Sequence, residues 1–225
     1  MARVTLIGAH GKVGLLAMPL LVEAGHEVTG IIRRPEQADA VNATGATAVV
    51  ADVEQLSVDD LAALLGGSEV VVWSAGAGGG SPERTYAVDR DAAVRTIDAA
   101  EQATVDRFVM VSYFGAGADH GVPPDNPFFA YAEAKAAADA HLEASSLSWT
   151  ILAPSALTLD EPSGHVEAGE GVTGSHVSRG NVARVIAAVV DASTGTAGRV
   201  IAFNDGATPI ADVVQGRGAA PTASS

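Results

Sequence analysis

The chain has 225 residues, of which 48 % are hydrophobic and only 4 % aromatic, so we expect a sizeable core built mainly from Val, Leu, Ile and Ala. Its 13 basic and 27 acidic residues give a formal charge of −14, which repels nucleic acid and anionic membranes and argues against both as partners. The absence of cysteine excludes disulfides, thiolate catalysis and thiolate metal sites. The first residues lead straight into an expected strand without the charged and long apolar segments of a leader sequence, so we expect a cytoplasmic protein.

Short runs rich in Val and Ile alternate with Ala-rich stretches of helical length along the first two thirds of the chain. Six strands are predicted, at residues 4–7, 27–32, 46–50, 69–73, 108–112 and 149–152. Helices are predicted between them, at residues 12–24, 35–43, 58–65, 82–102 and 128–145. Strands that are apolar on both faces and are joined by helices predict an α/β fold, a doubly wound parallel sheet with helices on both faces.

The alternation breaks after Pro154. Residues 155–178 are rich in Gly, Ser, Thr, Glu and His and show no clear helical period. A helix, a strand and a short helix are predicted beyond them, at residues 181–191, 199–203 and 210–214. We therefore expect one domain over residues 1–215, with 155–180 as a small substrate-side insertion and 216–225 as a disordered tail.

A glycine turn, Gly8-x-x-Gly11-x-x-Gly14, follows the first predicted strand and opens the first predicted helix. The first glycine permits a tight turn, the second permits the backbone to approach a pyrophosphate, and the third permits close packing of helix on strand. The helix N-terminus then offers free N–H groups to the phosphates. In this context the turn predicts a dinucleotide-binding Rossmann fold. Three further residues of the turn are candidate cofactor contacts, with His10 meeting phosphate or solvent: His10, Lys12 and Val13.

The end of the second predicted strand indicates which nucleotide is bound. An NAD site usually has an acid at this position, where it binds the ribose hydroxyls. Here the strand is followed by Arg33 and Arg34, whose guanidinium groups suit a 2′-phosphate, although solvated surface arginines are the alternative. NADP is therefore favoured over NAD. Asp52, after the third strand, either accepts a hydrogen bond from the adenine amino group or is an ordinary loop acid.

Several motifs occur together in a fixed order along the chain. They are Gly8-x-x-Gly11-x-x-Gly14, Asp52-Val53, Ser74-Ala75-Gly76, Val111-Ser112-Tyr113 and Tyr131-Ala-Glu-Ala-Lys135. This set resembles the short-chain dehydrogenase/reductase superfamily, and more narrowly its atypical NAD(P)-binding members of the epimerase/dehydratase group. The chain is also similar in size to biliverdin reductase B/flavin reductase-like proteins. The strand ending at Pro154 and the later Arg179-Gly-Asn-Val-Ala183 also resemble that group, with Asn181 in place of an acid, so the resemblance covers residues 3–214.

The resemblance implies catalytic roles for Ser112, Tyr131 and Lys135. The four-residue spacing of Tyr131 and Lys135 places both on one helix face, where the ammonium is expected to lower the pKa of the tyrosine. By resemblance, Lys135 also binds the nicotinamide ribose, and Ser112 orients or polarises a substrate carbonyl. The remaining implied cofactor contacts are Val53, Ser74, Ala75, Gly76 and Pro154. Tyr113 stands where many relatives carry Ser or Thr, and either lines the substrate cleft or packs under the loop.

Our leading hypothesis is an NADP-dependent oxidoreductase that transfers hydride to or from a small carbonyl or alcohol. The long loops 114–129 and 155–178 are expected to cover the substrate. One alternative is a non-catalytic NADP-binding sensor or partner-binding module, and a second is a flavin or quinone reductase that does not need Tyr131 as an acid. The six histidines show no metal-ligand spacing, so no metal is expected. Monomer and homodimer both remain open.

Overall fold

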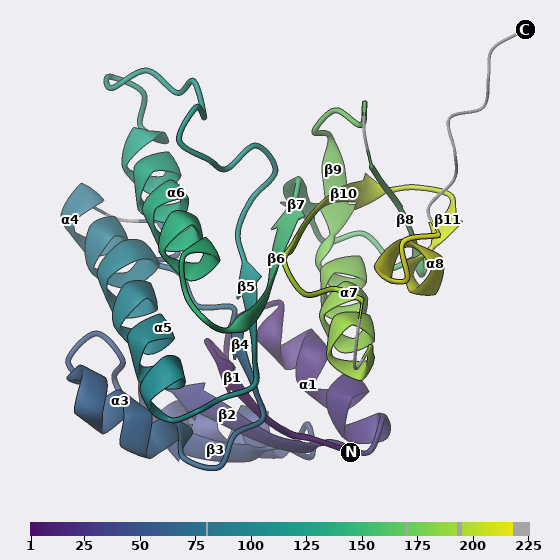
Figure 1. The fold of residues 1–225 in the computed structure, drawn as a ribbon. Helices are drawn as coiled ribbons and strands as arrows, with labels where there is room; N and C mark the ends of the chain where they lie inside the picture. The colour runs from purple at the N-terminus through teal and green to yellow at the C-terminus, as the bar shows by residue number, and fades with distance from the viewer. Residues whose placement is uncertain (80, 170, 193–194, 218–225) are drawn as a thin grey trace, which may run out of the picture.

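The structure is a computed structural model, and it describes residues 1–225 apart from 80, 170, 193–194 and 218–225. In this described part, nine strands form one sheet in the order β11-β8-β10-β6-β5-β4-β1-β2-β3 (Figure 1). These strands are β1 (Arg3–Ile7), β2 (Glu27–Ile32), β3 (Thr47–Val50), β4 (Val70–Trp73), β5 (Arg107–Val111), β6 (Ser148–Pro154), β8 (His165–Ala168), β10 (Arg199–Asp205) and β11 (Thr208–Pro209). All neighbours from β3 to β10 run parallel, which confirms the predicted parallel sheet. Beyond β10, β8 pairs antiparallel with β10, and β11 pairs antiparallel with β8. The sequence does not indicate these two strands.

Helices cover both faces of this sheet. They are α1 (Gly14–Glu23), the 3₁₀ turn η1 (Pro35–Gln37), α2 (Ala38–Asn42), α3 (Val58–Leu65), α4 (Pro82–Thr85), α5 (Ala93–Gln102), α6 (Phe129–Glu143), α7 (Arg179–Asp191) and α8 (Ile210–Val214). Figure 1 shows α3, α5 and α6 on one face and α1 and α7 on the other. This arrangement is the doubly wound α/β fold that the alternation of strands and helices predicts.

The strands bury side chains on both faces, and the two faces belong to two separate hydrophobic clusters. Along β4, Val70 and Val72 join the cluster that contains α1 and α7, whereas Val71 and Trp73 join the cluster that contains α3, α5 and α6. Burial of each such side chain contributes roughly 1.5–3 kcal/mol. The near-continuous apolar runs therefore arise because successive residues point to opposite, equally buried faces.

The long helix predicted at residues 82–102 contains a break in its hydrogen-bond pattern. Between α4 and α5 the backbone forms a π-helical segment, η2 (Tyr86–Ala92). A π-helical turn holds one residue more than an α-turn, so side chains after it are rotated about the helix axis. In this segment Asp89 is buried with 1 % of its surface exposed. Helix propensity does not register such an insertion, and the sequence therefore predicted one uniform helix.

Residues 155–178 contain three short strands where the sequence showed no regular period. The first and last of them, β7 (Ala156–Thr158) and β9 (His176–Ser178), pair in parallel as a separate small sheet, and β8 joins the main sheet. Each has only three or four residues, too few to show an alternating pattern. Most of the predicted disordered tail, residues 218–225, lies outside the described residues.

Two buried asparagines fix the loops around these short strands. The Asn181 side-chain amide donates to Ser163 Oγ at 3.1 Å, to the His165 carbonyl at 3.1 Å and to Asp205 Oδ1 at 2.6 Å. Its oxygen accepts from the Gly164 N–H at 2.9 Å. Asn204 connects the following loop, donating to Glu167 Oε1 at 2.8 Å and to the Thr173 carbonyl at 2.9 Å, and accepting from the Ser175 N–H at 2.9 Å. Both asparagines have 1 % or less of their surface exposed, so these bonds form in a dry environment.

The contact between Asn181 and Asp205 predicts the effect of placing an acid at position 181. Asn181→Asp places a second carboxylate against Asp205, and we expect it to lower the free energy of unfolding by about 2 kcal/mol, or the melting temperature by roughly 4–8 °C. Thermal denaturation near neutral pH measures this loss. The reciprocal pair Asn181→Asp with Asp205→Asn restores an amide–carboxylate contact and is expected to recover most of it. An unchanged melting temperature in the single variant would contradict this role.

Candidate active site

The glycine turn after β1 has no room for side chains. Gly8 adopts φ +87°, and a Cβ added there would lie 2.6 Å from the Ala75 backbone nitrogen at the end of β4. A Cβ at Gly14 would lie 2.7 Å from the carbonyl oxygens of Gly8 and Ala9, and one at Gly11 would lie 3.0 Å from the Gly8 oxygen. Helix α1 begins at Gly14, and the N–H groups of Lys12, Val13 and Gly14 have no hydrogen-bond acceptor among the described residues. The turn therefore forms a backbone cradle of the kind that accepts a diphosphate.

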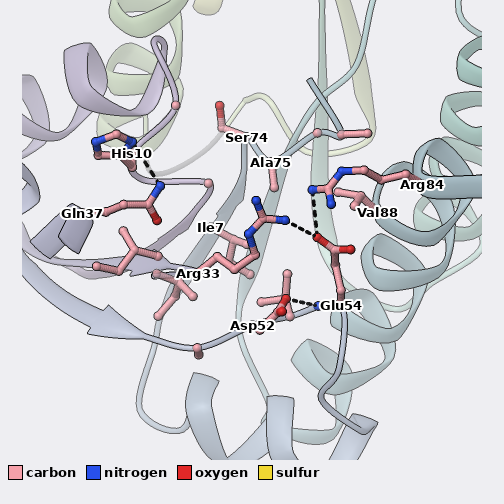
Figure 2. A pocket seen from close by; sticks show the side chains of 18 residues that line it. Ile7, His10, Arg33, Gln37, Asp52, Glu54, Ser74, Ala75, Arg84 and Val88 are labelled. Carbon is pink, nitrogen blue, oxygen red and sulfur yellow. Dashed lines mark hydrogen bonds and ion pairs between the residues drawn. The ribbon is translucent and has the colours of Figure 1, made fainter. Parts of the chain in front are cut away.

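One side of the cradle opens into a cavity of about 280 Å³, shown in Figure 2. Arg33 and Arg84 enter it from opposite sides, and Glu54 lies between them with Oε1 at 3.0 Å from Arg33 and 3.1 Å from Arg84. Asp52 lines the same cavity, and its Oδ1 accepts from the Glu54 N–H at 3.1 Å. His10 contacts Gln37 at 3.3 Å across the cradle. The cavity thus contains two guanidinium groups that share one carboxylate.

The two arginines that follow β2 differ in position. Arg33 lines this cavity, whereas Arg34 does not and instead pairs with Glu36 at 3.3 Å, with 56 % of its side chain exposed. The sequence predicts that both contact a 2′-phosphate. Both lie in the bend after β2, and Arg34 directly precedes the turn η1, so its side chain meets an acid of that turn and not the cavity.

The other side of the cradle opens into a larger cavity of about 1060 Å³. The two cavities share Gly11, Ser74, Ala75, Gly76 and Ala77 as lining residues. Further predicted site residues line the larger cavity, namely Lys12, Val13, Ser112, Tyr131, Lys135 and Pro154. Val53 lines the smaller one, so of the predicted site residues only Gly14 and Arg34 line neither. Because β4, β5 and β6 are neighbours and parallel, residues at their carboxyl ends meet at one edge of the sheet.

Buried polar groups lie beneath the larger cavity. Lys135 is 1 % exposed, and its Nζ donates to the Val111 carbonyl at 2.7 Å. One helical turn further along α6, Asp139 accepts a short hydrogen bond from the Ser112 hydroxyl. Its other oxygen, Oδ1, has no partner among the described residues. Asp89, from the π-helical segment, accepts from the Ala77 N–H at 3.0 Å and lines the cavity opposite them.

Burial dominates the ionisation of these groups. Desolvation raises the pKa of Asp89 and of Asp139, and it lowers the pKa of Lys135 although both carboxylates oppose that change. The pKa of Tyr131 is raised, first by burial and then by the negative charges of Asp89 and Asp139. The expectation that Lys135 lowers the pKa of Tyr131 is therefore wrong for this structure, because burial and two carboxylates outweigh one desolvated ammonium.

Sequence reasoning missed four charged residues of the site. Glu54 and Arg84 line the smaller cavity, Asp89 lines the larger one, and Asp139 lies beneath it and bonds Ser112. Asp139 stands eight residues after Tyr131 and four after Lys135, so helical spacing could have identified it as a third member of that face. The others come from elements that only the tertiary fold brings together.

Both of the roles that the sequence leaves open for Tyr113, lining a cleft and packing against neighbouring residues, are present in the structure. It lines the larger cavity, and its ring centroid lies 5.2 Å from that of Phe128 and 5.5 Å from that of Tyr131. Its hydroxyl is buried and has no hydrogen-bond partner among the described residues. Tyr113 therefore packs in an aromatic cluster and lines the cavity, while its hydroxyl oxygen is closed off from solvent.

These features fit a nicotinamide dinucleotide. The glycine cradle leaves space for a diphosphate, with one cavity on each side for the two nucleoside halves. The fold and this site define an NAD(P)-binding protein of the Rossmann type. In the described residues no cluster of three or more His, Cys, Asp or Glu could hold a metal ion, and no helix is both long and apolar enough to span a membrane.

Comparison with known proteins places the chain more narrowly. It matches the NAD(P)H-binding family over residues 8–193 and belongs to that family. It is 33 % identical to the Bacillus subtilis protein named uncharacterized sugar epimerase YhfK, covering 95 % of this chain and 99 % of that protein. The resemblance to an atypical NAD(P)-binding group of the short-chain dehydrogenase/reductase type is thereby confirmed.

Solved structures agree with this assignment. A protein of Bacillus halodurans, titled as an NAD-dependent epimerase/dehydratase, superimposes with a TM-score of 0.88 at 33 % identity, covering 96 % of this chain and 100 % of that one. The oxidoreductase YlbE of Lactococcus lactis superimposes with a TM-score of 0.84 at 27 % identity, covering 95 % of each chain. The chain therefore has an NAD(P)-binding fold that is shared by proteins named as oxidoreductases and as epimerases.

The buried carboxyl of Asp139 predicts a pH-dependent stability difference. Its pKa is raised in the folded protein, so stability falls as pH rises through that raised value. Asp139→Asn removes this cost, and its melting temperature relative to wild type is expected to be higher at about pH 8 than at about pH 5. Glu23→Gln, at an exposed acid on α1, is the control and is expected to show little change between the two pH values. Equal differences for Asp139→Asn at both pH values would contradict the prediction.

Proposed function

We propose that the protein is an NADP-dependent oxidoreductase that reduces a carbonyl compound to an alcohol. The observation that carries this proposal is the continuity of the two cavities. They join the glycine cradle to Ser112, Tyr131 and Lys135 through a shared strip from Ser74 to Ala77. A dinucleotide that lies across the cradle would thus present its nicotinamide end to those three side chains.

The chain offers groups for each part of the cofactor. Gly8, Gly11 and the first turn of α1 would bind the diphosphate, and Asp52 and Val53 would contact the adenosine end. Ser74, Ala75 and Gly76 would guide the molecule into the larger cavity, where Pro154 and Lys135 line the nicotinamide end. When bound, NADPH supplies the hydride that adds to the substrate carbonyl carbon.

The guanidinium N–H donors of the smaller cavity support NADP rather than NAD. Arg33 and Arg84 both reach the cavity and share one acceptor, the carboxylate of Glu54, so they have N–H groups left over for a ligand. A 2′-phosphate carries up to two negative charges and can accept paired hydrogen bonds from both groups. Glu54 would then hold the two arginines in place for the phosphate.

This arrangement distinguishes the two neighbouring arginines. Arg33→Gln is expected to raise the Kd for NADPH about tenfold or more and to leave the Kd for NADH nearly unchanged, because only NADPH carries the 2′-phosphate. Arg34→Gln is the matched control and is expected to leave both constants unchanged, since Arg34 lies outside the cavity. Fluorescence titration of each nucleotide measures both constants. A parallel loss of NADPH and NADH affinity would contradict the assignment.

The ionisation of Tyr131 favours reduction over oxidation. A tyrosine with a raised pKa stays protonated at neutral pH, so it can donate a proton to the oxygen of a carbonyl as hydride arrives at the carbon. Burial also favours the protonated form of Asp139, which can return the short hydrogen bond to Ser112 and free the serine hydroxyl to bind the substrate oxygen. Lys135 contributes a fixed positive charge below the site.

The role of Tyr131 is tested with purified protein, NADPH and a panel of carbonyl compounds. Tyr131→Phe is expected to lower kcat roughly 100-fold or more while NADPH binding is retained, because only the proton donor is removed. Tyr86→Phe is the control, since Tyr86 lies outside both cavities and stacks against Arg90 at 4.7 Å. Tight NADPH binding without turnover of any compound would favour a nucleotide sensor instead.

A second candidate function is the reduction of a flavin or quinone. It is favoured by the aromatic wall of the larger cavity, where Tyr113, Phe128 and Tyr131 lie within 5.5 Å of one another by ring centroid. Such a reaction needs no phenolic acid. It therefore predicts NADPH consumption that Tyr131→Phe does not change, which is the opposite of the carbonyl reductase result.

A further inference from the structure

Asp139 lies behind the wall of the larger cavity and is connected to it by one hydrogen bond. Ser112 lines this cavity, whereas Asp139 lines neither cavity and is 7 % exposed. The Ser112 hydroxyl donates a short hydrogen bond to Asp139 Oδ2, and it makes no other hydrogen bond among the described residues. Asp139 therefore reaches a bound molecule through Ser112 and not by direct contact.

The second oxygen of Asp139 indicates which form of the carboxyl group the fold accommodates. Oδ1 is closed off from solvent and has no hydrogen-bond partner among the described residues. A carboxylate spreads its charge over both oxygens, so an ionised Asp139 would leave part of that charge buried without a partner. A carboxyl group that carries its proton on Oδ2 leaves only a neutral carbonyl oxygen at Oδ1. The geometry therefore favours the neutral acid.

The nearest cation does not provide the missing partner. Lys135 stands one turn before Asp139 on α6, but its Nζ donates to the Val111 carbonyl at 2.7 Å and lies 3.5 Å from Met110 Sδ. Its charge favours ionisation of Asp139 through space, yet Oδ1 of Asp139 still has no partner in the part of the chain that the structure describes.

Other titratable groups around Asp139 influence when it ionises. Burial raises the pKa of Asp139, the charge of Lys135 and the bond from Ser112 oppose this change, and the charge of Glu143 adds to it. The surrounding set comprises Tyr131, Lys135, His141 and Glu143 on α6, Tyr113 after β5, Asp89 on η2 and Asp98 on α5. Both tyrosines have raised pKa values themselves. A rise in pH therefore ionises Asp139 before it ionises either tyrosine.

We propose that Asp139 is a positioning residue, whose O–H donates to Ser112 Oγ and turns the serine hydroxyl toward the oxygen of the carbonyl substrate. The inference rests on the proposed reductase function and deepens it by naming the group that regulates Ser112. In the reaction Tyr131 gives its proton to the substrate oxygen, whereas Asp139 keeps its proton and holds the serine. Once Asp139 ionises, its carboxylate takes the serine hydroxyl as donor, because a hydrogen bond to a charged acceptor is the stronger one. The substrate oxygen then loses that donor.

The pH profile of turnover tests this role with benzaldehyde, a carbonyl compound without a titratable group. At saturating NADPH, wild-type kcat/KM is expected to fall about tenfold or more as pH rises through the pKa of Asp139, because the ionised acid withdraws the serine donor. Asp139→Asn is expected to keep the rate of the low-pH form and to lose this fall, since an amide N–H can donate to Ser112 Oγ at every pH. His141→Gln is the matched control. His141 is titratable on the same helix, pairs with Asp98 at 2.6 Å and lines neither cavity, so this variant is expected to keep the fall.

A second substitution separates the hydrogen bond from the charge. Asp139→Leu is neutral at every pH, as Asp139→Asn is, but it gives Ser112 no donor. Its kcat/KM is expected to be independent of pH and several-fold below that of Asp139→Asn, while the Kd for NADPH stays the same. Equal rates for the two variants would show that only the charge matters, and the positioning role would be overturned.

Infrared spectroscopy gives a readout that needs no turnover. The difference spectrum between wild type and Asp139→Asn is expected to show the C=O band of a neutral carboxyl group, which disappears as pH rises and shifts in Ser112→Ala. If no carbonyl compound is reduced but this band is present and shifts, the bond stands and the reductase proposal fails. If benzaldehyde is reduced and Asp139→Asn has the wild-type pH profile, the positioning role is overturned and the reductase proposal stands. If the band is absent at every pH at which the protein is folded, Asp139 is always ionised and the inference is overturned.

Discussion

The close approach of β1 to β4 at Gly8 is the constraint on which the rest of the site depends. The Ser74 N–H donates to the Ile7 carbonyl at 2.9 Å, and the turn that follows Ile7 packs against the Ala75 backbone with no room for a Cβ. This contact places the glycine cradle directly beside the strip shared by the two cavities. A bulkier residue at Gly8 would separate the strands at the point where both halves of a dinucleotide must pass.

The charged and polar side chains around this strip are held in position by hydrogen bonds and ion pairs within the protein, without a ligand. Glu54 holds two guanidinium groups at one end, and the Val111 carbonyl and Asp139 hold Lys135 and Ser112 at the other. Groups that are already oriented need little rearrangement when a ligand arrives, which preserves binding free energy. The price is the burial of Asp89, Asp139 and Lys135 in an apolar environment, which explains why all three pKa values move toward the neutral forms.

Local patterns in the sequence were sufficient for the main fold and for part of the site. The glycine turn, the apolar strands and the Tyr131–Lys135 spacing each lie within one element, so their neighbours along the chain reveal them. The π-helical segment that buries Asp89 lies inside an ordinary helical pattern, and the antiparallel strands are too short to show alternation. Glu54, Arg84 and Arg179 reach the cavities only through tertiary packing, and the turn η1, which begins directly after Arg34, turns that residue away from the cavity that Arg33 lines. The order in which the site residues follow one another along the chain could therefore be predicted, whereas the ion pairs among them could not.

The two buried asparagines have a consequence for how such a protein diversifies during evolution. Asn181 and Asn204 anchor the loops around the substrate side from positions on α7 and β10, and none of their hydrogen bonds reaches the glycine cradle. Loop residues between these anchors can be exchanged by mutation without disturbing the nucleotide half. Mutations can therefore change the substrate preference of the C-terminal half while the nucleotide-binding half stays unchanged. Relatives that share this scaffold are free to acquire different substrates through a small number of surface changes.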